Sequence, residues 1–405
     1  MRAPYFLLLL IFLFFHSCTL GRFVFWNFAN IDDYEKFQNR PIANDPEQIF
    51  EFPIAESDTF RLPNLRLKKK KYEFLEGLKK SKTVAFLVLR NDSILYEHYD
   101  HGYEKDTPVN SFSVAKSYVS TLLGMARDEG KIESLEDPIT AYVPELPESL
   151  QKVSLRNLLE MRSGIDFKES YFNPFGDAAA YYYGRNIKKQ FPKLALERDP
   201  DGVFQYRSVN TQLLAEALEN IYDAPLNEIM AEKIWIPLGS EQAASWSIDA
   251  KKQGTFKAFC CLNGVARDFA RLGILFMNEG EWNGTQLISK EWVREATAFK
   301  EATNNYRYKY QWWGHTTLQT KSDSLFYPER YIEYSTQQKD GTDRTGIIFP
   351  LDTYSAEGFL GQYIYVNPKE RVVIVRLGEK SSNPNPSWRR YFEWIAVRNG
   401  VNRNS

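Results

Sequence analysis

Two β-hairpin patterns near opposite ends of the chain restrict its fold more than any other feature. Residues 83–99 form two β-type runs around Asn91 and Asp92, a dipeptide typical of tight turns. Residues 362–378 show a second pair of runs around Pro368, and a helical pattern follows them. Because the sequence between the hairpins is mostly helical, we predict an α+β fold, an α/β sandwich. One antiparallel sheet, completed by both chain ends, would be flanked by helices, with a helical subdomain at about residues 131–250.

The composition is that of a globular protein and excludes few functions. The 405 residues are 43% hydrophobic and 25% charged, which fits one large domain or two smaller ones. A formal net charge of −1 gives no argument for nucleic-acid binding. Of the three cysteines, Cys260 and Cys261 are adjacent, and neighbouring cysteines rarely bridge, so we expect neither a disulfide framework nor a metal site.

The first residues have the layout of a secretory signal. A positive charge precedes an apolar run over residues 5–15, which is too short to span a bilayer comfortably. We predict a leader at residues 1–18 that ends in a lipoprotein-type site. Cys18 would then be lipidated and the protein exported, held at the membrane in the periplasm or at the cell surface. Phe15 and His16 fit that site poorly, so plain secretion and an uncleaved anchor stay open as alternatives.

The stretch after the leader has no clear periodicity. Residues 19–82 are rich in Asn, Asp, Pro and Lys and contain a basic run. We predict an irregular N-terminal extension there, followed by one main domain at residues 83–400. The sequence contains no internal repeat that would suggest a solenoid or array.

Residues 111–131 predict a buried helix that carries two reactive side chains at its start. Ser113 and Lys116 are separated by one helical turn, so their side chains meet on the same face. The simplest interpretation is a capping serine and a lysine whose stem lies along the core. However, a serine nucleophile needs a base, and burial would favour the neutral lysine that can supply one. The positive end of a helix also favours a serine alkoxide over an ammonium.

Other arrangements for activating a serine find less support. The four histidines lie in the leader, beside the first hairpin and at His315, which we expect to be a packed or rim residue. A G-x-S-x-G turn, which places the serine of an α/β-hydrolase triad, is absent from the sequence. Ser149 and Lys152 repeat the S-x-x-K spacing, but we set them aside because they stand between Pro147 and a modest apolar stretch.

The order of motifs resembles the serine β-lactamase and penicillin-binding-protein superfamily. "SFSVAKS" resembles its S-x-x-K box, residues 153–167 its M-x-S-G turn, residues 201–219 its second box, and residues 357–378 the strand with its third box. The resemblance covers about residues 80–400. Its branch contains class C β-lactamases, family VIII-type esterases and 6-aminohexanoate-dimer hydrolases. It implies a β-lactamase/transpeptidase-like fold and a serine hydrolase without a cofactor or metal.

The resemblance also implies roles for individual residues. Ser113 would be the nucleophile, and Lys116 would help to deprotonate it. Tyr206 matches the tyrosine of the second box, a base for acylation and for activating the deacylating water. It could otherwise be a core tyrosine. Ser208 stands where relatives often have Asn and can still form hydrogen bonds, with Asn210 as an alternative.

The third box departs from the pattern of the superfamily. The resemblance implies an oxyanion hole made by the backbone N–H groups of Ser113 and Phe359, with Gly358 letting the substrate approach. The usual cation is missing, and Glu357 stands beside the gap. If Glu357 faces the cleft, it would repel an anionic substrate, and if it lies on the outer face of the strand, it would do nothing. In both cases, activity on β-lactams or D-Ala-D-Ala peptides is disfavoured.

We therefore predict an exported serine hydrolase that cleaves a small-molecule or peptide ester or amide through an acyl-enzyme. One alternative is a D,D-peptidase or weak β-lactamase, and another is a binding protein that has kept the fold but lost turnover. The aromatic-rich segments 171–186 and 310–331 are expected either to line the pocket or to pack over the core. The acyl group, the leaving group and the oligomeric state stay open.

Overall fold

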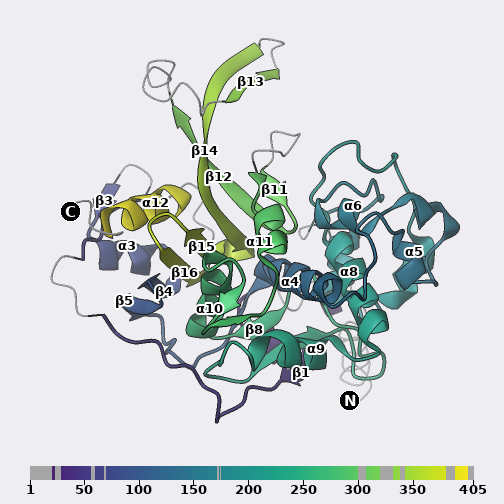
Figure 1. Ribbon diagram of the computed structural model, residues 1–405, viewed down its shortest axis with the longest axis horizontal. Helices are drawn as coiled ribbons and strands as arrows, with labels where there is room; N and C mark the ends of the chain where they lie inside the picture. Colours follow the sequence, from purple (N-terminus) through teal and green to yellow (C-terminus); the bar gives the residue numbers. More distant parts are fainter. Residues whose placement is uncertain are drawn as a thin grey trace, which may run out of the picture. The chain divides into compact units, whose positions relative to one another are not determined.

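The computed structural model describes most of the chain as two compact units (Figure 1). The described residues are 21–22, 29–55, 60–67, 70–170, 173, 175–299, 307–319, 332–337, 343–379 and 388–399. The first unit takes Met1–Glu51, Glu104–Asp268 and Gly358–Leu360, and the second takes Phe52–Tyr103, Phe269–Glu357 and Gly361–Ser405. The predicted leader, with Cys18, lies outside the described residues. Among the residues that are described, no helix is both long and apolar enough to cross a membrane.

The second unit is built on an eight-stranded antiparallel sheet. Its strands follow the order β11-β12-β14-β15-β16-β4-β5, and β13 pairs with β14. Their bounds are Thr83–Arg90 (β4), Ser93–Tyr99 (β5), Tyr308–Lys309 (β11), Trp312–Gln319 (β12), Ile332–Gln337 (β13), Asp343–Gly358 (β14), Gln362–Asn367 (β15) and Val372–Gly378 (β16). Since β16 lies beside β4, both chain ends complete the sheet, as the two hairpin patterns predict.

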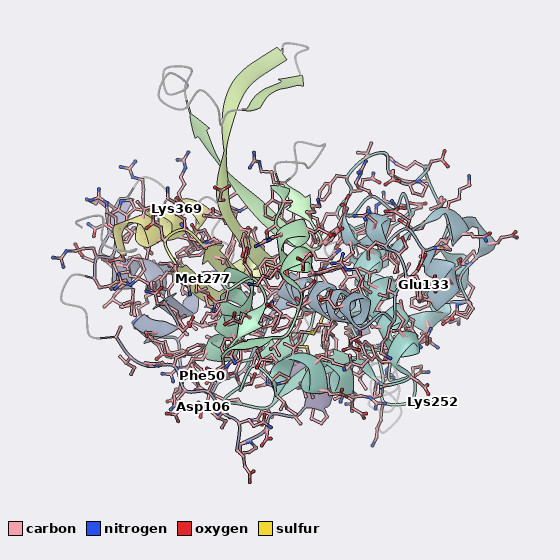
Figure 2. The ribbon with its side chains drawn as sticks, viewed as in Figure 1. Phe50, Asp106, Glu133, Lys252, Met277 and Lys369 are labelled. Atoms are coloured by element: carbon pink, nitrogen blue, oxygen red, sulfur yellow. A yellow bond between two sulfur atoms is a disulfide. The ribbon has the colours of Figure 1, made fainter. Side chains whose placement is uncertain are left out.

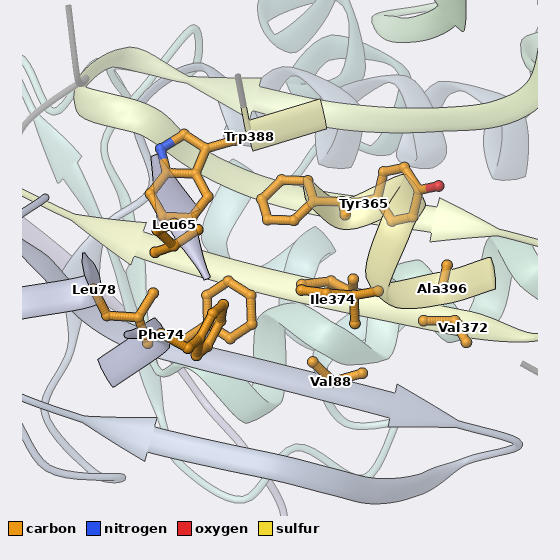
Figure 3. Close-up of a cluster of buried hydrophobic side chains, with 12 residues drawn as sticks. Leu65, Phe74, Leu78, Val88, Tyr365, Val372, Ile374, Trp388 and Ala396 are labelled. Atoms are coloured by element: carbon orange, nitrogen blue, oxygen red, sulfur yellow. The ribbon is translucent and has the colours of Figure 1, made fainter. Parts of the chain in front are cut away.

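Helices cover both faces of this sheet. One face packs against α3 (Phe74–Lys80) and α12 (Trp388–Asn399) in a cluster of buried apolar side chains (Figure 3). On the opposite face lies α10 (Ala266–Met277), whose last residue is labelled in Figure 2. Its Gly273 lies so close to the sheet that a Cβ there would be 2.7 Å from Val373 Cγ1. Successive residues of a strand point to opposite faces, so a sheet covered on both sides needs strands that are apolar throughout.

The two predicted hairpins are confirmed. Asn91 and Asp92 connect β4 to β5 with φ values of 47° and 65°, the left-handed conformation that a tight two-residue turn requires. Residues 368–371 connect β15 to β16. The helix predicted after the second hairpin is α12.

The first unit combines a four-stranded sheet with most of the helices. The sheet order is β1-β7-β8-β6, with β1 at Gln38–Ile42, β7 at Ala244–Ile248, β8 at Leu262–Gly264 and β6 at Val109–Asn110. The helices are Ala115–Asp128 (α4), Ile139–Tyr142 (α5), Leu155–Leu159 (α6), Asp177–Tyr183 (α7), Ser208–Tyr222 (α8) and Leu226–Met230 (α9). Short helical turns lie at Asp33–Glu35, Phe112–Val114, Glu148–Lys152, Lys188–Lys193, Ala231–Trp235 and Phe359–Gly361. The second unit also contains β2 (Leu65–Leu67), β3 (Lys70–Tyr72), β9 (Glu281–Trp282), β10 (Thr285–Gln286) and α11 (Lys290–Ala296).

The stretch at residues 19–82 is more regular, where it is described, than its composition predicts. β1 pairs with β7 in the first unit, and α3 contributes Phe74 and Leu78 to the core of the second. Between these elements, Phe50 N donates to the carbonyl of Gly239 at 2.9 Å. Long-range pairing of short segments leaves little periodicity in a sequence, which explains why β1 was missed. The apolar residues Phe74, Leu75 and Leu78 do have the spacing of an amphipathic helix, which α3 confirms.

We predict that Gly239→Ala destabilises the protein more than Gly130→Ala. Both glycines have positive φ values, 62° and 71°, so both substitutions carry a conformational cost of about 1–2 kcal/mol. A Cβ at Gly239 would also lie 2.7 Å from Gln48 O and Phe50 N, whereas one at Gly130 would meet nothing within 4 Å. Overpacking adds about 1–3 kcal/mol. Equal losses in the free energy of unfolding, measured by urea denaturation, would show that the contact at residues 48–50 does not hold.

Candidate functional site

The candidate nucleophile Ser113 lies in a short helical turn between β6 and α4. The turn is fixed by two contacts: Ser111 N donates to the carbonyl of Leu262 at 2.9 Å, and Phe112 N donates to Asn110 Oδ1 at 2.9 Å. Phe112 has a φ of 46°, which turns the chain sharply just before Ser113. The simpler alternative, a serine that caps the helix, does not hold, because α4 begins at Ala115 and its N-terminus has no side-chain cap. Ser113 is half-buried and its hydroxyl is directed at Lys116.

Lys116 is buried within α4 and contacts Ser113 directly. Its Nζ lies 3.0 Å from Ser113 Oγ and donates to the carbonyl of Phe259 at 2.6 Å. The side chain is almost inaccessible, with 1% of the residue exposed. Burial lowers the pKa of Lys116 to about 8, although the Glu169 carboxylate acts in the opposite direction. A substantial fraction of the amine is therefore neutral in mildly alkaline solution.

The second-box residues lie at the start of α8. The ring of Tyr206 faces Lys116, with Nζ 5.1 Å from the ring centroid. The structure thus brings Ser113, Lys116 and Tyr206 together, as the motif order predicts. Ser208 is buried, and both its backbone N and its Oγ donate to the Glu169 carboxylate, at 2.7 and 2.6 Å. The proposed contact of Ser208 with substrate stays a prediction.

Asn210 and Glu169 form hydrogen bonds that connect the second box to neighbouring segments. Asn210 is buried and accepts a hydrogen bond from Ser163 Oγ at 2.7 Å, which ties α8 to the M-x-S-G turn. Glu169 was missed by sequence reasoning, because a single carboxylate in a loop carries no spacing signal. It links the second box to Lys116 by binding Ser208 and by favouring the charged form of the amine.

The third-box residues follow the end of β14. Gly358 is the last residue of that strand, and Phe359 lies in the helical turn after it rather than in the strand. The backbone leaves the extended conformation there because Leu360 has a φ of 61°. The Phe359 ring packs edge-on against Phe112 at 5.5 Å between centroids. Phe359 and Ser113 line one small hollow, together with Ala29, Phe112 and Cys260. The placement is compatible with the predicted oxyanion hole, whose role stays a prediction.

Glu357 in the second unit has an ionic partner that neither alternative included. Its carboxylate accepts two hydrogen bonds from Arg389, both of 2.7 Å, and a third from Ser355 Oγ at 2.5 Å. Burial opposes ionisation of Glu357, but the charge of Arg389 and hydrogen bonds from Arg389 and His315 outweigh it and lower its pKa to about 2. Glu357 is thus an ionised carboxylate whose charge is compensated by Arg389.

His315 is a packed residue, as predicted. Its ring stacks on Tyr365 at 5.3 Å between centroids, and its Nε2 lies 2.7 Å from Ser355 Oγ. Burial lowers its pKa, so the ring is neutral at physiological pH. Of the two aromatic-rich segments, the described tyrosines pack in the core: Tyr182 is buried in α7 and donates to Asp33 Oδ2 at 2.7 Å. Tyr310 is buried in the second unit.

The expectation that the adjacent cysteines stay apart is wrong. Cys260 and Cys261 form a disulfide, and both residues are buried. Cys261 has a φ of 68°, a backbone conformation that non-glycine residues rarely adopt. Adjacency in sequence does not predict this local turn, which explains why the bridge was missed.

Comparison with known proteins agrees with the motif order. Residues 73–394 match the family model described as beta-lactamase. The chain is 27% identical over 373 residues to the 6-aminohexanoate-dimer hydrolase of Paenarthrobacter ureafaciens, covering 86% of this chain and 82% of that protein. Among solved structures, a candidate 6-aminohexanoate-dimer hydrolase from Bacillus anthracis has a TM-score of 0.71 at 24% identity, with 92% of each chain covered. A family VIII carboxylesterase has a TM-score of 0.55 at 15% identity, covering 80% of this chain and 95% of that one. The structural likenesses show a shared fold.

We predict that the rate at which a fluorophosphonate labels Ser113 rises with pH through about 8, as Lys116 loses its proton. In Glu169→Gln, this rise moves to lower pH, because the carboxylate that stabilises the ammonium is gone. Glu133→Gln is the control, since Glu133 is an exposed residue of the same unit (labelled in Figure 2). A rise that stays in place in Glu169→Gln would contradict the electrostatic link between Glu169 and Lys116.

Proposed function

Because the chain belongs to the beta-lactamase family and is a serine hydrolase, we propose that it cleaves an ester or amide through an acyl-enzyme on Ser113. The observation that carries this proposal is the 3.0 Å contact between Ser113 Oγ and the buried Nζ of Lys116. A hydroxyl becomes a useful nucleophile only when a base removes its proton. Burial lowers the pKa of Lys116 to about 8, so part of the amine is neutral near that pH and can serve as the base.

Acylation would proceed in the following way. The neutral amine of Lys116 takes the proton of Ser113 Oγ as the oxygen attacks the substrate carbonyl. The backbone N–H groups of Ser113 and Phe359 stabilise the negative charge that forms on the carbonyl oxygen. Lys116 and Tyr206 then return a proton to the leaving alcohol or amine, and the acyl group stays on Ser113.

Deacylation needs a water molecule and a base on the same side of the ester. Tyr206 faces Lys116 at the edge of the site and is half-buried, so it can contact both solvent and the amine. We assign Tyr206 the activation of this water, with Lys116 as its proton partner. Attack on the acyl-enzyme releases the acid and restores the Ser113 hydroxyl.

The proposed substrate is uncharged near the scissile bond. Ala29, Phe112, Cys260 and Phe359 line the hollow beside Ser113, and none of them carries a charge. The relatives include a 6-aminohexanoate-dimer hydrolase and a carboxylesterase, and others are named class C beta-lactamases, so the names alone do not choose the substrate. The cation with which relatives hold a substrate carboxylate is missing from the third box, and Glu357 stands beside the gap. Arg389, the ionic partner of Glu357, is already engaged. These features favour esters and amides over β-lactams and D-Ala-D-Ala peptides.

The leader predicted at residues 1–18 supports a proposal about location. We propose that the enzyme is exported and held at the membrane through a lipid on Cys18, and that it meets its substrate outside the cytoplasm. Globomycin, which blocks lipoprotein signal cleavage, would leave the leader on the protein if this proposal holds. Removal of the leader in the presence of globomycin, or a mature protein without a lipid on Cys18, would contradict it.

We predict that Ser113→Ala lowers turnover at least about 10³-fold on every substrate of an ester, amide and β-lactam panel. Lys116→Met should lower it by about 10²–10⁴, the usual contribution of a general base. Ser149→Ala is the matched control: it belongs to the second S-x-x-K pair, whose serine and lysine are both exposed. Initial rates on p-nitrophenyl acetate, anilides and nitrocefin measure these effects.

The panel also separates the alternatives. Nitrocefin hydrolysis or fluorescent-penicillin labelling that exceeds ester hydrolysis would favour the β-lactamase or D,D-peptidase alternative. A wild-type protein that a fluorophosphonate fails to label would favour a binding protein without turnover. Activity that survives Ser113→Ala would contradict the proposed nucleophile.

A further inference from the structure

The disulfide between Cys260 and Cys261 lies next to two parts of the proposed catalytic site. Cys260 lines the hollow beside Ser113. The preceding residue, Phe259, supplies the carbonyl that accepts a hydrogen bond from Lys116 Nζ at 2.6 Å. A bond between neighbouring cysteines closes a small ring that contains their shared peptide bond. The ring restricts rotation on both sides of that peptide, and the peptide that carries the Phe259 carbonyl is joined directly to the ring at the Cα of Cys260.

Hydrogen bonds also fix residues 257–260, the segment that leads into the disulfide. The buried Nζ of Lys257 donates to the carbonyls of Tyr181 and Tyr182, at 3.0 and 2.7 Å, which attaches the segment to α7. Trp246 Nε1 donates to the carbonyls of Lys257 and Cys260, at 3.1 and 2.8 Å. The segment that carries the Phe259 carbonyl is thus held by hydrogen bonds from Lys257 and Trp246, and by the disulfide as a covalent link.

The chemistry of the base explains why this carbonyl matters. A neutral lysine has two N–H bonds and one lone pair, and only the lone pair can take a proton from Ser113. When the Phe259 carbonyl accepts one N–H, it fixes the rotation of the amine and leaves the lone pair free to face Ser113 Oγ. Catalytic bases are commonly oriented by a third group in this way. Here the backbone carbonyl of Phe259 orients the base.

We infer that the Cys260–Cys261 disulfide is a positioning element for the catalytic base, because it fixes the carbonyl of Phe259 that orients Lys116. The inference rests on the proposed function and extends it. With the ring closed, Cys261 is held at its positive φ of 68°. With the ring open, Cys261 can relax toward the negative φ values that non-glycine residues favour. The peptide between the two cysteines then turns and shifts the Cα of Cys260, to which the peptide with the Phe259 carbonyl is attached.

Reduction of the pair is a balanced two-electron step. A dithiol such as dithiothreitol supplies two electrons and two protons, the bond between the two sulfur atoms breaks, and each cysteine gains a proton. The dithiol becomes a cyclic disulfide.

The inference predicts two changes on reduction. The maximal rate of Ser113 labelling falls by about 10- to 10²-fold, because a displaced base transfers the proton poorly. The pH at which the rate rises also moves down, since the lost carbonyl had stabilised the ammonium of Lys116 by accepting its hydrogen bond. Glu169 and the ring of Tyr206, which also face Lys116, are unchanged by the reduction. Simple destabilisation would lower the rate without moving the rise.

The experiment uses the whole chain with Cys18→Ser, so that the pair provides the only cysteines. Fluorophosphonate labelling is followed across pH before reduction, after reduction, and after reoxidation. Intact mass reports the gain of two hydrogen atoms, and circular dichroism reports whether the fold is kept. The double variant Cys260→Ser/Cys261→Ser should show the labelling rate of the reduced protein, and adding the reductant should not change that rate. If it does not fold, the reversible reduction of the natural pair decides the question.

A reversible loss of rate together with the shift to lower pH supports the inference. It is overturned if the pair carries free thiols before reduction, or if reduction changes neither the rate nor the pH of the rise. Both outcomes leave the proposed function intact as long as labelling depends on Ser113. Labelling that persists in Ser113→Ala would instead overturn the proposed function.

Discussion

The structure of the site depends on one buried amine. An ammonium removed from water is costly unless it is paired. Among the described residues, Lys116 Nζ contacts a carbonyl, a hydroxyl and two aromatic rings, and no salt bridge joins it to a carboxylate. Burial among these groups lowers the pKa of Lys116 to about 8. The same burial places the amine against Ser113, so a single packing arrangement supplies both the base and its position.

The surrounding elements can be understood as supports for this amine. The turn at Phe112 delivers Ser113 to the start of α4, and the interior of α4 buries the lysine. Glu169 binds Ser208 at the start of α8 and limits how far the pKa of Lys116 falls. The segment that ends in the Cys260–Cys261 disulfide supplies the carbonyl on the other side. The turn at Phe112 positions the nucleophile, and the other supports act on the protonation or the orientation of Lys116.

Sequence reasoning found the parts whose signal is periodic or ordered. The hairpins at both chain ends predicted the sheet, and the helical period from residue 111 placed Ser113 and Lys116 on one face. The parts that it missed act through the backbone or through distant partners. The Phe259 carbonyl has no signature in a sequence, Glu169 is a single loop carboxylate, and Arg389 lies far along the chain from Glu357.

The most direct test of this account is an NMR titration of lysine side chains labelled with ¹³C at Cε, followed from pH 6 to 11. The Lys116 signal is assigned by its absence from Lys116→Met. Lys257→Met identifies the second lysine that is buried in the described part of the chain, whose pKa burial lowers to about 7. The account predicts that Lys116 titrates at about 8. A midpoint near about 10.4, the value of a lysine in water, would show an amine that stays charged, and would contradict its role as the base.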